Sequence, residues 1–418
     1  MPEKLYIGMA GFGTVGRGVY TVLKRNAEII ERRSGHALEI KTIVCRDIKK
    51  AHDFANEANI VNDLNAIIDD PEISIAVEVM GGIKPAKSFI LNAIRNGKDV
   101  VTANKALLAT HGDEIFREAQ KHNRRVYFEA SVAGGIPIIK ALREGLAANQ
   151  IFEITGILNG TCNYILSSMH QSPVSFEDAL KEAQKLGYAE ADPTFDIEGL
   201  DTGHKLTILS ALAFGTPYQF DSSRVCGITS VSSTDVKYAQ KFGFVIKLLA
   251  IARKNKDNIS FSVSPTLVPE NTFLAHVNAA MNAVEIKSDA LGTSFYYGAG
   301  AGGEPTASAV LADLVDLARG NQVSMPLSEA NSVALMPIDA VNDKNYIRLH
   351  APLINEKAGL VEQIFKQFDI RIDKEMSEEN NLVFITHECS ENRFSSALDR
   401  IRRSFGETIA IHVMKIKK

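Results

Sequence analysis

A glycine-rich segment near the start of the chain constrains the fold more than any other feature. Residues 4–10 (KLYIGMA) have the composition of a buried strand, and Gly11, Gly13 and Gly16 follow in G-x-G-x-x-G spacing before a helical pattern. In this context the glycines permit a tight turn, a close approach of the backbone to a pyrophosphate, and close packing of helix on strand. The segment predicts a dinucleotide-binding α/β domain; a glycine-rich turn without a ligand is the alternative.

The end of the next predicted strand bears on which dinucleotide binds. Residues 38–47 (LEIKTIVCRD) end in Arg46 and Asp47, and Lys49 and Lys50 follow. An acidic residue at this position suits the ribose hydroxyls of NAD, whereas an arginine suits the 2′-phosphate of NADP. The pattern favours NADP, with NAD as the alternative.

The strand–helix alternation continues through the first 145 residues. Residues 74–80 read as a strand, the helix after it stops at Gly97, and the strand VVTA leads into Asn104 and Lys105. Because open parallel sheets bind ligands at the carboxyl ends of their strands, we expect Lys105 beside the cofactor. An ordinary lysine at a helix start is the alternative.

The segment 187–205 (GYAEADPTFDIEGLDTGHK) is the most polar stretch with a possible chemical role. Its five acidic residues are Glu190, Asp192, Asp196, Glu198 and Asp201. Asp201 and Lys205 are one i,i+4 step apart at the start of an apolar helix, so they share a face. A buried lysine oriented by a carboxylate is a candidate proton donor. A solvated helix start with a weak ion pair is the alternative.

Beyond residue 145 the pattern changes, and we predict a second, α+β domain. Residues 223–231 and 259–267 read as strands, and residues 235–254 between them as a helix. The glycine-rich loop 298–306 then leads into a long helix that returns the chain to the first domain. Residues 346–418 spell the ferredoxin-like order βαββαβ.

The predicted domains are therefore three. They are a dinucleotide-binding domain (1–145, completed by about 305–345), a substrate and dimerisation domain (146–304) and a ferredoxin-like domain (346–418).

Composition narrows the classes of function. The net charge is −4 and no basic stripe is present, which argues against nucleic-acid binding. No apolar run has the length of a membrane span. The four cysteines are scattered without a CxxC pair, which argues against a disulfide framework or a zinc site and fits a reducing cytoplasm.

Several motifs resemble those of homoserine dehydrogenases. They are GFGTVG, TANKALLA, EASVAGGIP, GILNGTCNYIL, GYAEADPTFDIEGLDTGHKLTIL and GAGAGG. The resemblance implies a Rossmann-type first domain, and residues 346–418 resemble an ACT domain, a module that often senses amino acids. The turn Asn355–Gly359 departs from the usual D-x-P-G entry of that module. No aspartate kinase domain precedes the motifs, so the chain resembles the monofunctional form.

The resemblance implies interconversion of L-homoserine and L-aspartate 4-semialdehyde in threonine and methionine biosynthesis. It implies Lys205 as the proton donor, Glu190 and Asp201 as groups that bind substrate and orient Lys205, and Lys105 as a second active-site lysine. Further cofactor positions implied by the resemblance are Phe12, Thr14, Val15, Gly187 and Gly302.

The resemblance also implies a structural sodium ion and regulated assembly. Glu129, with the carbonyls of Val132, Gly134 and Ile136, matches the sodium site. From the residues alone a plain turn is the preferred interpretation of this segment, although oxygen ligands suit a hard cation. We expect a homodimer or homotetramer, with an amino-acid effector at the ACT-like domain.

Two other functions compete. A phosphorylating semialdehyde dehydrogenase needs a nucleophilic cysteine with a base, and Cys162 is the one candidate in a polar turn. A catalytically inactive amino-acid sensor would use the ACT-like domain alone. The presence of Lys105, Glu190, Asp201 and Lys205 together argues against the sensor.

Overall fold

The computed structural model describes residues 3–255, 258–321 and 333–418, and within them the chain forms two compact units. The first unit takes its described residues from 1–154, 204–220 and 282–333, and the second from 155–203, 221–281 and 334–418. The predicted domain boundaries near residues 145 and 345 stay predictions. Part of the segment predicted to complete the first domain, 322–332, lies outside the described residues.

A parallel sheet forms the centre of the first unit. Its strand order is β3-β2-β1-β4-β5-β6. The strands are β1 (Lys4–Ala10), β2 (Ala37–Val44), β3 (Asn59–Val61), β4 (Ile73–Glu78), β5 (Asp99–Thr102) and β6 (Val126–Tyr127). The order reverses between β1 and β4, the kind of switch point at which open α/β sheets bind ligands. The Rossmann-like fold expected from the sequence is confirmed.

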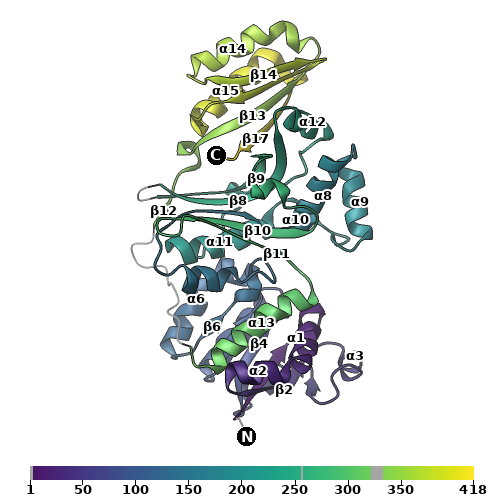
Figure 1. The fold of residues 1–418 in the computed structure, drawn as a ribbon, viewed down its shortest axis with the longest axis vertical. Coiled ribbons are helices and arrows are strands. Elements are labelled where there is room, and N and C mark those ends of the chain that lie inside the picture. Colours follow the sequence, from purple (N-terminus) through teal and green to yellow (C-terminus); the bar gives the residue numbers. More distant parts are fainter. Residues whose placement is uncertain (1–2, 256–257, 322–332) are drawn as a thin grey trace. The chain divides into compact units, whose positions relative to one another are not determined.

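Helices cover this sheet. They are α1 (Thr14–Arg25), α2 (Ala27–Ser34), α3 (Ile48–His52), α4 (Asn65–Ile68), α5 (Lys84–Arg95), α6 (Lys105–Lys121), α7 (Ile138–Lys140) and α13 (Gly303–Ala318). Helix α13 lies beside α1 although the two are far apart in sequence (Figure 1). Ile7, Met9, Val77 and Val101 share one hydrophobic core with these two helices. No helix in the described part of the chain is long and apolar enough to cross a membrane.

Two glycines allow the backbones of α1 and α13 to meet. A Cβ atom placed on Gly18 would overlap the carbonyl oxygen of Gly303, and it would lie 3.2 Å from the side chain of Ala307. The contact therefore requires a residue without a side chain at position 18. It fixes the start of α13 beside the first turns of α1.

Two strands and one helix contain divisions between the units. They are β7 (Ile151–Ile157), β10 (Met281–Ser288) and α11 (Leu200–Phe214). Strand β11 (Thr293–Ala299) pairs with β10, and the apolar helix expected at Asp201 and Lys205 is part of α11.

The second unit combines a long hairpin with the ferredoxin-like module. Its strands run in the order β8-β9-β17-β13-β15-β14. They are β8 (Phe244–Asn255), β9 (Asn258–Pro269), β13 (Asn342–His350), β14 (Ile372–Glu378), β15 (Asn381–Thr386) and β17 (Ala410–Ile416), with the short β12 (Ala334–Leu335) and β16 (Cys389–Ser390) paired beside them. The helices are α8 (Gly160–Gln171), α9 (Phe176–Lys185), α10 (Thr194–Ile197), α12 (Ser233–Lys241), α14 (Ala358–Gln367) and α15 (Glu391–Phe405).

A buried ion pair joins the ferredoxin-like module to α12. The Arg348 guanidinium on β13 donates from Nε and Nη2 to the Asp235 carboxylate, at 2.7 and 3.0 Å, and Tyr346 donates to the same carboxylate at 3.0 Å. Burial opposes ionisation of Asp235, but the Arg348 guanidinium holds the pKa of this carboxyl below its usual value. Asp235 also completes the N-terminal capping box of α12 with Ser232. Both ends of the ion pair are therefore fixed.

Two predictions from local pattern were wrong. The helix predicted over residues 235–254 ends at Lys241, Gly243 turns the chain with φ of +80°, and β8 follows. The segment 223–231 is not a regular strand: a short 3-10 turn precedes a single bridge from Val225 to Val263.

We predict that Gly18→Ala destabilises the first unit by about 1–3 kcal/mol, because the added methyl group separates α1 from α13. Gly145→Ala is the matched control, since a Cβ atom there meets nothing within 4 Å. Urea unfolding of both variants measures the effect. Equal stabilities of the two variants would contradict the importance of the close contact.

Candidate functional site

The glycine-rich loop is tightly closed on one side and open on the other. Gly11 has φ of +107°, and a Cβ atom there would lie 2.6 Å from the Val79 carbonyl group. A Cβ atom on Gly16 would overlap the carbonyl oxygen of Gly11, whereas one on Gly13 would meet nothing within 4 Å. The loop is thus held close to β4 and leaves open space at the N-terminus of α1. This arrangement fits the pyrophosphate of a dinucleotide.

The second glycine loop adjoins the first. Gly302, with φ of +126°, is the N-cap of α13, and a Cβ atom on Gly303 would lie 3.3 Å from the carbonyl oxygen of Thr14. Of the predicted cofactor positions, Thr14 and Gly302 are thereby brought together at the starts of α1 and α13.

Glu78 connects the carboxyl ends of β4 and β5. Its fully buried carboxylate accepts hydrogen bonds from Thr102 Oγ1 at 2.6 Å and from the N–H groups of Met80 and Gly81 at 2.9 and 3.2 Å. Burial raises the pKa of the Glu78 carboxyl despite these bonds. The Thr102 hydroxyl accepts in turn from the N–H of Asn104. Sequence analysis did not single out Glu78; its side-chain partner, Thr102, lies on another strand.

Lys105 occupies the first position of α6, directly after the carboxyl end of β5. Asn104 caps this helix: its Oδ1 accepts from the N–H of Leu107 at 3.1 Å, and its Nδ2 donates to the Gly82 carbonyl at 2.7 Å. The half-buried Lys105 therefore begins a helix whose start is fixed to the loop after β4. Because β4 borders the switch point, the position is suited to contact a cofactor.

The segment 129–136 forms the turn predicted to bind sodium. Both oxygens of the buried Glu129 carboxylate accept backbone hydrogen bonds, from Ile139 at 2.9 Å and Lys140 at 2.7 Å. Burial raises the pKa of Glu129 to about 7. Val132, Gly134 and Ile136 follow on the same turn, and Gly134 has φ of +54°.

The donor set limits which ion this turn could bind. Among the described residues, no group of three or more His, Cys, Asp or Glu could hold a metal ion. One carboxylate with backbone carbonyls suits a hard cation of low charge, and it offers little to a transition metal. Glu129 and the backbone carbonyls of this turn are oxygen ligands of the kind that a monovalent cation uses, and the sodium site stays a prediction.

The second unit holds a network of carboxylates around the start of α8. Asn159 Nδ2 donates to Asp196 at 2.7 Å and to Asp201 at 2.9 Å, while its Oδ1 caps α8 by accepting from the N–H of Cys162 at 2.8 Å. Thr161 Oγ1 donates to the other Asp196 oxygen at 3.2 Å. One amide thus fixes two acidic side chains that lie far from it in sequence.

Sequence analysis named Asp201 as a site residue but missed Asn159, Thr161 and Asp196 as its neighbours. The polar turn Asn159–Thr161 could have given a signal, because asparagine before a helix is a typical side-chain cap. Which carboxylates this turn would bind was not visible in the sequence.

Helix α11 carries the predicted acid and lysine pair. Asp201 is 2% exposed and Lys205 is 8% exposed, so both are buried in the first two turns. The alternative of a solvated helix start is therefore wrong. Glu190 is exposed on the segment before α11, and its backbone carbonyl accepts from Gln184 Nε2 at 3.1 Å. Gly187, with φ of +78°, ends the turn after α9.

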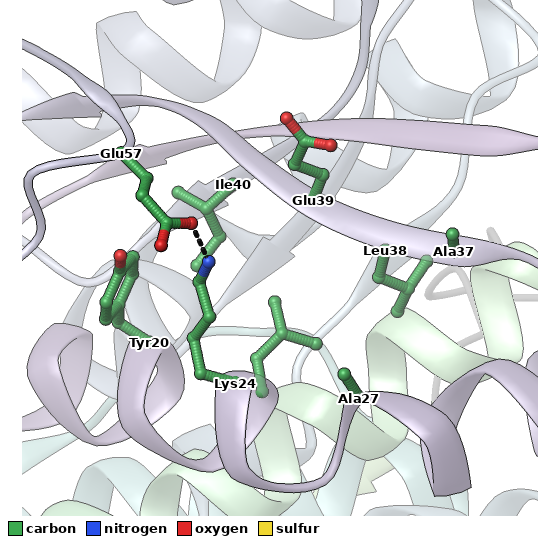
Figure 2. A pocket seen from close by; sticks show the side chains of 9 residues that line it. Tyr20, Lys24, Ala27, Ala37, Leu38, Glu39, Ile40 and Glu57 are labelled. Atoms are coloured by element: carbon green, nitrogen blue, oxygen red, sulfur yellow. Dashed lines mark hydrogen bonds and ion pairs between the residues drawn. The ribbon is translucent and has the colours of Figure 1, made fainter.

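Two cavities lie away from these residues. One, of about 250 Å³, lies between α1 and β2 in the first unit, where Lys24 forms an ion pair with Glu57 beside Tyr20 (Figure 2). The other, of about 300 Å³, lies against β9 and β17 in the second unit. Neither is lined by any residue that the sequence predicted for catalysis or cofactor binding.

The first unit has a parallel sheet with an open glycine loop at its switch point. The chain also carries a buried lysine one helical turn after a buried carboxylate. Together these features define a nicotinamide-dinucleotide-dependent oxidoreductase. Two family models identify the branch of this class. Residues 11–129 match the model described as "Homoserine dehydrogenase, NAD binding domain", and residues 137–315 match "Homoserine dehydrogenase". The chain belongs to the homoserine dehydrogenase family.

Individual relatives agree with this assignment over nearly the whole chain. The chain is 45% identical to a homoserine dehydrogenase of Neisseria gonorrhoeae over 410 residues, covering 94% of each protein. It is 43% identical to one from Pseudomonas aeruginosa, covering 98% of this chain and 99% of the relative.

Solved structures give the same result for the fold. A homoserine dehydrogenase from Thiobacillus denitrificans superposes with a TM-score of 0.94 at 45% identity, covering 100% of this chain and 99% of the other. A hyperthermophilic archaeal homoserine dehydrogenase in complex with NADPH superposes with a TM-score of 0.65 at 28% identity, covering 77% of this chain and 99% of the other.

We predict that Asn159→Ala lowers kcat/KM at least tenfold, because two carboxylates lose the amide that fixes them. The variant also loses a helix cap, which costs about 1 kcal/mol of stability. Ser175→Ala is the matched control: Ser175 caps α9 by accepting from Asp178 and binds neither Asp196 nor Asp201. Steady-state kinetics and urea unfolding of both variants separate the two effects. Equal losses of activity would show that helix capping alone explains the result.

We predict that Glu129 makes the stability of the folded state depend on pH. Its folded pKa of about 7 lies above the ordinary 4.5, so the folded chain retains a proton that the unfolded chain releases. Stability relative to Glu129→Gln should therefore fall by about 3 kcal/mol as pH rises from 4.5 to 7. Urea unfolding across this range, in choline chloride, measures the difference; parallel profiles of wild type and variant would contradict it.

Proposed function

We propose that the chain interconverts L-homoserine and L-aspartate 4-semialdehyde in threonine and methionine biosynthesis, with Lys205 as the proton donor and acceptor. The observation that carries this proposal is the first two turns of α11. Asp201, fixed by the Asn159 amide, precedes the buried Lys205 by one helical turn. A carboxylate and an ammonium group in these positions can hold a polar substrate and transfer a proton.

The proton transfer follows from the charge change at the substrate oxygen. The bound dinucleotide supplies the hydride acceptor in one direction and the hydride donor in the other. As hydride adds to the aldehyde carbon, negative charge develops on its oxygen, and Lys205 Nζ donates a proton there. In the oxidative direction neutral Lys205 accepts the hydroxyl proton. General acid–base catalysis of this kind contributes roughly 10²–10⁴-fold.

Binding of the substrate needs charges of both signs. L-Homoserine carries an α-ammonium group, which suits the carboxylates of Glu190 and Asp201, and an α-carboxylate, which suits a cation. Lys105, at the start of α6, is proposed to lie at the nicotinamide and the substrate. For the cofactor we propose NADP, bound by Gly11–Gly16, Arg46, Lys105, Gly187 and Gly302, with NAD as the alternative.

Three further features belong to the same proposal. Glu129 with the carbonyls of Val132, Gly134 and Ile136 would bind a structural sodium ion. The ferredoxin-like module would act as an ACT domain that binds an amino-acid effector. The assembly would be a homodimer or homotetramer of the monofunctional form. The sheet order β17-β13-β15-β14 supports the assignment of the module, because it is ferredoxin-like.

The competing thiol mechanism has little support. Cys162 is fully buried, and its Sγ donates to the Asp196 carbonyl at 3.2 Å. A nucleophilic cysteine needs access to substrate and a base that lowers its pKa. The capping position that Asn159 gives to Cys162 explains the residue structurally.

We predict that L-homoserine reduces NADP or NAD in the presence of the protein, seen as growth of reduced-nicotinamide absorbance. Lys205→Met should bind the dinucleotide normally but lose turnover by roughly 10²–10⁴-fold, because methionine retains an apolar stem without the ammonium group. Lys185→Met, at an exposed lysine of α9, is the control and should keep full activity.

Both outcomes are informative. Near-normal turnover of Lys205→Met would refute the proton-donor assignment while leaving the reaction intact. Absence of homoserine-dependent reduction with either dinucleotide, in folded wild type with sodium present, would refute the proposed reaction.

A further inference from the structure

Arg17 lies at the carboxyl end of β2, although it belongs to α1. The Gly11 N–H donates to the Val44 carbonyl at 2.9 Å, which ties the glycine loop to the last residue of β2. Burial and the Asp47 charge raise the pKa of the neighbouring Cys45 thiol, and the Arg17 guanidinium acts in the opposite direction. The Arg17 guanidinium also contacts the ring of Phe12, the residue after Gly11, so it lies beside the glycine loop that is tied to this strand end. Arg17 therefore lies near the strand end that Arg46 follows in the sequence.

Two aromatic rings hold the Arg17 guanidinium. Its Cζ lies 5.9 Å from the Phe12 ring centroid and 5.8 Å from that of Phe54, and the two rings lie edge to face at 5.8 Å. Contact through the faces of aromatic rings leaves the N–H groups at the edge of a guanidinium available for acceptors. The side chain is therefore fixed in place without using its hydrogen-bond donors.

The donors of Arg17 lack acceptors in the described part of the chain. Its buried Nε has no hydrogen-bond partner there, and neither Arg17 nor Arg46 forms an ion pair with a described carboxylate. A buried donor without an acceptor destabilises the folded chain. An anionic ligand at this strand end would remove that cost, because phosphate oxygens match the fork of a guanidinium.

The acidic residue at the same strand end has another role. The Asp47 carboxylate caps α3 by accepting from the Lys50 N–H at 3.1 Å. A carboxylate that is to bind both ribose hydroxyls of NAD must point at the ribose. One oxygen of Asp47 is used in capping, and the other charged groups beside it in the sequence, Arg46, Lys49 and Lys50, are cations.

We propose that Arg17 and Arg46 together bind the 2′-phosphate of NADP, and that Arg17 is a residue that determines the choice of dinucleotide. The inference rests on the proposed function, since it assumes that the glycine loop binds a nicotinamide dinucleotide. It goes beyond that function by assigning Arg17 to a part of the ligand that NAD lacks.

The test measures binding by titration calorimetry, without turnover. The ligands are NADP, NAD, 2′,5′-ADP and 5′-ADP, and the last two differ from each other in the position of a phosphate. Arg17→Ala should weaken NADP and 2′,5′-ADP by about tenfold or more and leave NAD and 5′-ADP within about twofold. Arg17→Lys should recover part of the loss, because it restores the charge but not the fork.

Lys24→Ala is the matched control on the same helix. Lys24 pairs with Glu57 and lies over the Tyr20 ring, so its ammonium group already has a partner (Figure 2). Its loss removes one positive charge from α1, so it reports the general effect of charge on nucleotide binding. We expect its ratio of NADP to NAD affinity to match the wild type. An unchanged melting temperature of Arg17→Ala with bound NAD establishes that the loop is intact.

The outcomes separate this inference from the proposed function. If Arg17→Ala weakens NADP and NAD equally, Arg17 supports the loop or the adenine and the inference is wrong. The same holds if the variant binds all four ligands normally, or if wild type prefers NAD. If wild type binds neither dinucleotide, the proposed function fails together with the inference.

Discussion

The close backbone contact between α1 and α13 is the constraint on which the cofactor side of the first unit depends. Gly18 on α1 faces the Gly303 carbonyl oxygen so closely that no side chain fits between them. The contact brings the Gly302 loop to Thr14, at the start of the helix that faces the predicted pyrophosphate. Two segments far apart in sequence thereby meet where the cofactor is proposed to bind. The late return of the chain to this sheet would therefore complete the proposed site.

Whether a buried carboxyl group in this chain has a raised or a lowered pKa depends on whether its hydrogen-bond donors are neutral or charged. Glu78 and Glu129 accept hydrogen bonds mostly from neutral backbone N–H groups, and burial still raises the pKa of both carboxyls. Asp235 is equally inaccessible, yet the Arg348 guanidinium keeps its pKa below the ordinary value. Neutral donors offset only part of the loss of hydration, whereas a paired full charge reverses its effect. The Asp235 carboxylate, the stable anion, thus joins the ferredoxin-like module to α12. Glu78 and Glu129, the carboxyls with raised pKa, lie near the predicted cofactor and sodium positions.

Local pattern predicted the elements whose signals are self-contained. The strand–loop–helix at Gly11–Gly16, the helix that stops before Gly97, and the helices α11 and α13 all appear as expected. Residues 235–254 were predicted wrongly because strong helix formers continue across Gly243, and pairing with β9 makes the second half a strand. The short β3 was missed, because three residues carry no clear period. In these cases long-range pairing decided the structure.

The same limit explains what the sequence could say about the site. The apolar helix left burial of Lys205 open beside a solvated helix start. Asn159 could not be linked to Asp196 and Asp201, because that pairing spans 37 and 42 residues. The adjacent residues Arg46 and Asp47 left the dinucleotide open, since each favours a different one. A single hydrogen bond, from the Lys50 N–H to Asp47, changes the balance by occupying the carboxylate in a helix cap. Where two neighbouring residues favour opposite ligands, the chemistry is decided by which side chain the local backbone already uses.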